Sequence, residues 1–156
     1  MNQRGILVLA LWVSGLVVLA PHDSNAEDRE WQSVGESGTG PWQVYIDKQS
    51  IKRDDRGHIH VHVLDDHRVT LSGVDRFDDN GDLYRDKGYQ HRSTITHYVL
   101  DCEKQEEVSL SIGYYDGDMG RGNLVLFERP SNVYWSDILF FIEPKLTSTV
   151  CRWPNN

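Results

Sequence analysis

The chain has 156 residues and a formal net charge of −8, with 24 acidic against 16 basic side chains. Such a negative charge repels nucleic acid and anionic lipid, which argues against a DNA-binding or membrane-surface protein. The part that follows residue 26 has about 130 residues, a length typical of one domain with one hydrophobic core.

Residues 1–26 have the pattern of a secretory signal peptide. An early arginine precedes an apolar run over residues 6–20, and Ser24 and Ala26 place small side chains at the −3 and −1 positions of a cleavage site. An uncleaved anchor is the alternative, but a spanning helix needs about 20 apolar residues and this run is shorter. We expect cleavage after Ala26, one β domain over residues 27–156, no later membrane span, and no lipid anchor, since no cysteine lies near the cleavage site.

The first part of the exported chain has the pattern of antiparallel strands. Residues 31–35 and 42–47 are short apolar and aromatic runs joined by a loop rich in turn formers. After a turn at residues 54–57, apolar residues and histidines alternate with period two. One face of this strand is expected to carry Ile59, Val61 and Val63, and the other His58, His60 and His62.

The polar stretch over residues 72–92 contains Asn80-Gly81, a strong turn signal, so we expect a loop or an irregular hairpin there. Strand character resumes over residues 93–102 and 108–115. Simple alternation in the second of these strands predicts one shared face for Val108, Leu110, Ile112 and Tyr114.

The last part combines a turn, a strand and a helix. A glycine-rich turn over residues 116–122 leads to a strand over residues 123–127, and residues 137–142 fit either a strand or a helix. Pro144 suits the first position of a short helix over residues 145–153. The expected fold class is mainly β (α+β): a single antiparallel sheet with a short C-terminal helix.

The chain has two cysteines, Cys102 and Cys151. In an exported protein an even number of cysteines indicates a disulfide. This pairing would tie the sheet to the helix and close a loop of roughly 50 residues, which the chain-entropy account values at about 4 kcal/mol. Two free thiols or an intermolecular bond are the alternatives.

The histidine series His58, His60 and His62 is a candidate metal site. Alternate strand residues lie about 6–7 Å apart, so two of these imidazoles can share one zinc or copper ion. His67 or Asp65 would complete the ligand set. A solvated, histidine-rich strand face is the competing interpretation, and pH sensing is a third.

The acidic stretch over residues 75–86 fails the test for a calcium-binding EF-hand loop. With Gly81 at loop position six, Arg76 and Lys87 occupy positions one and twelve, which should both be acidic. We therefore interpret it as an acidic, solvated turn.

Neither a nucleophile elbow nor a phosphate-binding glycine loop occurs in the sequence, so we expect no enzyme. Aromatic side chains beside turns are better candidates for a protein-contact surface, because tyrosine and tryptophan dominate binding hot spots. The candidates are Tyr115, Tyr134 and Trp135.

Several short motifs resemble the surface-adhesin protein E-like family. They are Tyr45-Ile46-Asp47 followed by Ser50-Ile51, Leu100-Asp101-Cys102, Gly113-Tyr114-Tyr115-Asp116, Gly122 before a strand, and the late Cys151. The resemblance covers residues 31–151 and implies a bacterial cell-envelope protein with an antiparallel sheet, a C-terminal helix and a bridging disulfide. It also implies binding to host or extracellular proteins.

Together, these patterns predict an exported, non-enzymatic binding module of the cell envelope, located in the periplasm, at the cell surface or outside the cell. Its expected partner is a protein, and it needs no cofactor. The alternative is a periplasmic protein that binds zinc, copper or haem through the histidine-rich strand face.

Overall fold

The computed structural model describes residues 29–37, 40, 42–77, 83–130, 135–137 and 144–153. Several predictions fall outside the described residues: the signal peptide over residues 1–26, the turn at Asn80-Gly81, the contact residue Tyr134, and the segment 138–142.

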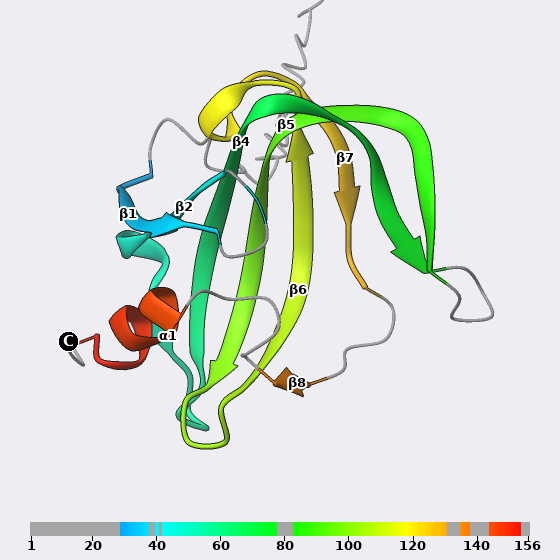
Figure 1. The fold of residues 1–156 in the computed structure, drawn as a ribbon. Helices are drawn as coiled ribbons and strands as arrows, with labels where there is room; N and C mark the ends of the chain where they lie inside the picture. The colour runs from blue at the N-terminus through cyan, green and yellow to red at the C-terminus, as the bar shows by residue number, and fades with distance from the viewer. Residues whose placement is uncertain are drawn as a thin grey trace, which may run out of the picture.

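The described strands form one antiparallel sheet (Figure 1). They are β1 (Trp31–Glu36), β2 (Gln43–Asp47), β3 (Lys52–Arg53), β4 (Ile59–Phe77), β5 (Leu83–Asp101), β6 (Glu106–Tyr115), β7 (Leu124–Glu128) and β8 (Ser136–Asp137). The order across the sheet is β1-β2-β4-β5-β6-β7, with β3 paired to β4 and β8 paired to β6. Short 3₁₀ turns follow β2 (Lys48–Ser50) and β6 (Asp118–Gly120), and the helix is α1 (Pro144–Cys151). The predicted fold class is therefore confirmed.

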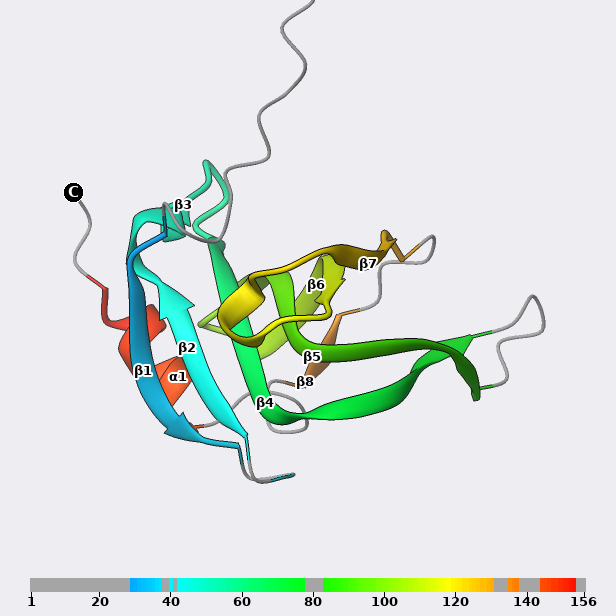
Figure 2. The same ribbon diagram turned by 90° about the horizontal axis from the view of Figure 1, so that it is seen from above.

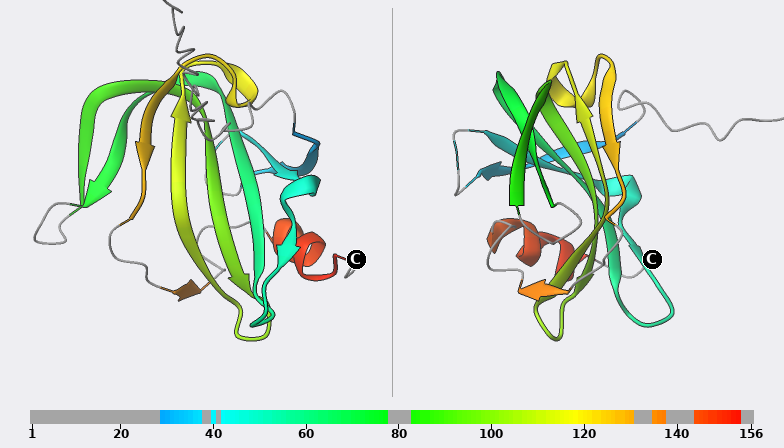
Figure 3. Two further views of the ribbon diagram at one scale, coloured as in Figure 1. Left: turned by 180° about the vertical axis from the view of Figure 1, so that it is seen from behind. Right: turned by 90° about the vertical axis from the view of Figure 1, so that its right-hand side faces the viewer.

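The hydrophobic core lies between the sheet and α1, which the side view in Figure 3 places on one side of the long strands. The period-two pattern of β4 is confirmed, since Ile59, Val61 and Val63 are buried in this core. Leu146 and Val150 of α1 complete it from the helix. We call this side of the sheet the helix face, and the side that carries the β4 histidines the outer face.

Of the two alternatives for the polar stretch at residues 72–92, the structure shows the irregular hairpin. β4 and β5, each 19 residues long, extend into this stretch from its two ends. The hairpin is irregular, with register shifts between Asp66 and Leu71 and between Ser72 and Val74. Arg68 adopts a positive φ of 59° and Gly73 one of 85°. These bulged positions allow the far half of the hairpin to bend away from the sheet, as Figure 2 shows from above.

The predicted alternation along β6 is wrong in its first half. His97 pairs with Ser111 but Tyr98 pairs with Ser109, which leaves Leu110 as an extra residue in a β-bulge. Paired residues share a face. Val108 therefore lies on the outer face beside Val99, while Ile112 and Tyr114 lie on the helix face.

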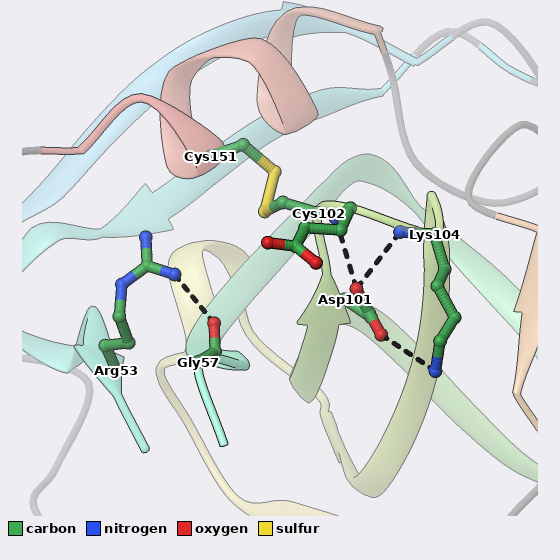
Figure 4. Close-up of a disulfide and its surroundings, with 7 residues drawn as sticks. Arg53, Gly57, Asp101, Cys102, Lys104 and Cys151 are labelled. Carbon is green, nitrogen blue, oxygen red and sulfur yellow. Dashed lines mark hydrogen bonds and ion pairs between the residues drawn. A yellow bond between two sulfur atoms is a disulfide. The ribbon is translucent and has the colours of Figure 1, made fainter. Parts of the chain in front are cut away.

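The disulfide between Cys102 and Cys151 is present and joins the turn after β5 to the last residue of α1 (Figure 4). The turn is held by the side chain of Asp101, whose Oδ1 accepts hydrogen bonds from the backbone N–H groups of Glu103 and Lys104. Lys104 Nζ also lies 3.2 Å from Asp101 Oδ2. The bond therefore fixes the helix to an ordered corner of the sheet.

Candidate binding surface

The largest exposed apolar side chains that share one strand are Leu124 and Phe127 of β7, which are 48% and 49% exposed. Phe127 pairs with Gly113, and Leu124 pairs with Tyr115. All four therefore lie on the outer face, at the β7 end of the sheet. We call Gly113, Tyr115, Leu124 and Phe127 the β7 patch.

Gly113 allows the side chains of the β7 patch to converge. A Cβ at this position would lie 3.1 Å from Cε2 of Tyr115 and 3.2 Å from Cδ1 of Leu124. The ring of Tyr115 and the side chain of Leu124 thus occupy the space that any other residue at position 113 would fill. Tyr115 of β6 and Leu124 of β7 therefore meet over Gly113.

The turn between β6 and β7 sets the position of the patch. Asp116 accepts hydrogen bonds from the backbone and side-chain amides of Asn123, which closes the turn. The hydroxyl of Ser93 donates to the Gly117 carbonyl at 2.6 Å and accepts from the Gly120 N–H at 2.9 Å. Ser93 is fully buried, so this anchor holds the turn against β5.

Two arginines lie close to the β7 patch along the chain, together with the acidic residues Asp116 and Glu128. The guanidinium of Arg129 lies over the Phe127 ring at 5.4 Å from its centroid. Arg121 is exposed in the turn that precedes β7. An apolar surface with an arginine on each side along the chain suits a partner with apolar and acidic side chains.

The two edges of the sheet differ in chemistry. The exposed residues of β1, at one edge, are Gln32, Ser33 and Glu36, which are polar. β7, at the other edge, exposes Leu124 and Phe127. An edge strand presents backbone N–H and C=O groups that can pair with another chain. β7 therefore combines such an edge with exposed apolar side chains.

The predicted contact residues Tyr115 and Trp135 lie far apart. Tyr115 is the last residue of β6, whereas Trp135 directly precedes β8, which pairs with Glu106 and Glu107 at the start of β6. β6 has ten residues, so its ends are roughly 30 Å apart. Trp135 is 41% exposed, and its ring lies 5.1 Å from that of His58. Tyr115 and Trp135 therefore have different neighbours and do not belong to one contact surface.

The predicted metal ligands divide into two groups. His60 and His62 lie on the outer face of β4, and His58 directly precedes this strand. The register places His97 of β5 directly opposite His62. His67 lies elsewhere: it is buried, and its ring packs edge-on against Trp42 and His91. Burial lowers the pKa of His67 to about 4. His97 was missed in the sequence because only strand pairing brings it to the other histidines.

Two carboxyl groups on the helix face carry raised pKa values. Glu107 is 2% exposed, its Oε2 has no hydrogen-bond partner, and burial raises its pKa to about 8. Burial likewise raises the pKa of Asp65 to about 6, against a lowering effect of its hydrogen bond from Thr94. The pKa of Tyr98 beside them is also raised, mainly by burial. These groups are interior, and none of them belongs to the exposed β7 patch.

No helix within the described parts of the chain is long and apolar enough to cross a membrane.

Comparison with known proteins identifies one family. The family model described as "Surface-adhesin protein E" matches residues 31–152. Two solved structures of Haemophilus influenzae protein E are similar to the chain at 18% sequence identity. For the first structure the TM-score is 0.44, and the matched region covers 69% of this chain and 76% of the Haemophilus chain. For the second structure, crystal form II, the TM-score is 0.41, and the matched region covers 69% of this chain and 79% of the Haemophilus chain. No curated protein sequence matches significantly.

Proposed function

Because the chain belongs to the surface-adhesin protein E family, we propose that this adhesin-type envelope protein is a non-enzymatic module that binds host or extracellular proteins through the β7 patch. The observation that carries the proposal is the pair of exposed side chains Leu124 and Phe127 on an edge strand. Monomeric proteins seldom gather exposed apolar side chains without an interaction that uses them.

The partner that fits this surface is an extended segment of another protein. Such a segment would pair with the backbone of β7 as an added strand, and every second side chain would contact the patch. Apolar side chains would cover Leu124 and Phe127, and acidic ones would meet Arg121 and Arg129. The rigid anchor at Ser93 keeps β7 and its turn in place, which lowers the entropy lost on binding.

The first test is binding of the purified protein to surfaces coated with extracellular-matrix proteins. Replacing both Leu124 and Phe127 by Ser should weaken binding by roughly 1,000-fold, since buried apolar anchors contribute about 2 kcal/mol or more each at hot spots. Both side chains are half exposed in the free protein, so the variant should keep its melting temperature.

Trp135→Ser is the matched control, because it removes another exposed aromatic residue at the far end of β6. Its binding should equal that of the unchanged protein. If Trp135→Ser abolishes binding and the double variant does not, the contact surface lies around β8, and the assignment to β7 is wrong. Equal binding by all three proteins would contradict a role for either surface.

We also propose that the protein is exported after cleavage behind Ala26, with its disulfide formed outside the cytosol. The Cys102–Cys151 bond supports this location, because such bonds persist in oxidising compartments. Mass spectrometry of the protein from fractionated cells should find Glu27 as the first residue and both cysteines oxidised. A cytosolic protein that retains Met1 and free thiols would contradict export.

A further inference from the structure

The outer face of the sheet also carries a histidine cluster on β4 and β5, beside the β7 patch on β6 and β7. Its members are His60 and His62 of β4 and His97 of β5. The neighbouring His58 contacts carboxylates instead, with Nδ1 3.5 Å from Asp54 and Nε2 3.8 Å from Asp101.

The spacing within the cluster suits a metal ion. His60 Nδ1 and His97 Nε2 are 3.1 Å apart, and the centroids of the two rings are 5.3 Å apart. Two imidazole nitrogens bound to one tetrahedral ion, at about 2.0–2.1 Å each, would lie about 3.3 Å from each other. Without an ion, the same two nitrogens can share one proton in a hydrogen bond.

Asp54 adds a second feature of a metal site. Its Oδ2 lies 3.7 Å from His60 Nε2, on the side of the ring away from His97. At this distance the carboxylate makes no direct hydrogen bond, but its negative charge favours the proton on Nε2 and so leaves the lone pair of Nδ1 for a metal. The positive charge of Arg29, which acts on His62 and His97, is offset by Asp47, whose Oδ2 lies 3.5 Å from Arg29 Nη1.

His62 can supply a third nitrogen. Its ring centroid is 4.8 Å from that of His97, and its buried Nδ1 has no hydrogen-bond partner. No three His, Cys, Asp or Glu side chains in the described residues are placed to hold one ion as they stand, so His62 must turn toward the pair. That movement breaks no hydrogen bond of Nδ1.

From this geometry we propose that His60 and His97, joined by His62, bind one zinc or copper ion on the outer face, with Asp54 orienting His60. Imidazole ligands suit both of these metals. The site is independent of the β7 patch and goes beyond protein binding.

Calorimetric titration of the tag-free protein with zinc chloride and with copper sulfate at pH 7.5 tests the proposal. We expect one ion per chain for at least one of the two metals. His60→Gln and His97→Gln should each weaken binding at least tenfold. Asp54→Asn, which changes no ligand, should weaken it about tenfold, as second-shell changes do.

His58→Gln is the matched control, because His58 directly precedes the same strand but contacts Asp54 and Asp101. It should retain full affinity. The proposal is overturned if neither metal binds, or if His60→Gln and His97→Gln bind as tightly as His58→Gln. Should the variants fail to fold, ¹⁵N NMR of the unchanged protein decides instead: zinc should shift the ring nitrogens of His60 and His97, and unshifted signals would refute the site.

Discussion

Breaking the Cys102–Cys151 disulfide is expected to lower the free energy of unfolding by about 4 kcal/mol. The bond spans 49 residues of sequence, so its loss releases a large loop in the unfolded chain. It also frees α1, an eight-residue helix that is too short to be stable alone. Leu146 and Val150 would then leave the core more readily, because packing would be left to hold the helix against the sheet.

Urea unfolding of the oxidised protein and of the Cys102→Ser/Cys151→Ser double variant measures this effect. Reductant should destabilise the unchanged protein to the level of the variant and leave the variant unaffected. Equal stability with and without reductant would show that the bond contributes nothing, and that α1 is held by packing alone.

Glu107→Gln is expected to remove a pH dependence of stability. Burial raises the pKa of Glu107 from 4.5 to about 8. Between these values the folded protein keeps a proton that the unfolded chain has lost, so a rise in pH favours unfolding by about 1.4 kcal/mol per pH unit. Glutamine resembles the protonated acid but cannot ionise. The variant should match the unchanged protein at pH 5 and exceed it by roughly 3–4 kcal/mol at pH 8.

The comparison of the two proteins at each pH isolates Glu107, since His62 and His67 titrate in both. Their lowered pKa values act in the opposite direction, destabilising the fold as the pH falls below about 6.5. Glu106→Gln is the control, because Glu106 is the half-buried neighbour on the other face of β6. If the stability difference between Glu107→Gln and the unchanged protein is constant from pH 5 to 8, the buried acid is not protonated in the fold.

Local sequence patterns predicted most of the fold, because the spacing of apolar residues along the chain follows from which side chains are buried. The alternation of Ile59, Val61 and Val63 follows from a strand with one face in the core. Pro144 begins the C-terminal helix because its ring fixes a helical φ, and it lacks only an N–H that the first turn leaves unpaired. The two cysteines indicated the bond between helix and sheet.

The pairing register of the strands could not be predicted from the sequence. The bulge at Leu110 reverses the two faces in the first half of β6. Glu107 therefore lies on the helix face and Val108 on the outer face. A second shift, between Tyr114 and Tyr115, places Leu124 and Phe127 on one face, although three positions separate them in sequence. Simple alternation would put them on opposite faces, so only Tyr115 of the β7 patch could be predicted.

The histidine cluster shows the same limit. Period two grouped His60 with His62, and His67 was expected to complete the ligand set. The register shift after Asp66 and the contacts with Trp42 and His91 place His67 in a separate buried group. His97 reaches the cluster only through the pairing of β4 with β5.

Hydrogen–deuterium exchange of the protein tests binding at β7 most directly, measured with and without the matrix protein that it binds best on coated surfaces. The outward backbone amides of an edge strand exchange quickly when unpaired and slowly when another strand covers them. We predict that binding slows exchange in residues 124–128 and leaves residues 31–36 unchanged. Unchanged exchange in residues 124–128, with protection elsewhere, would contradict the proposed binding surface.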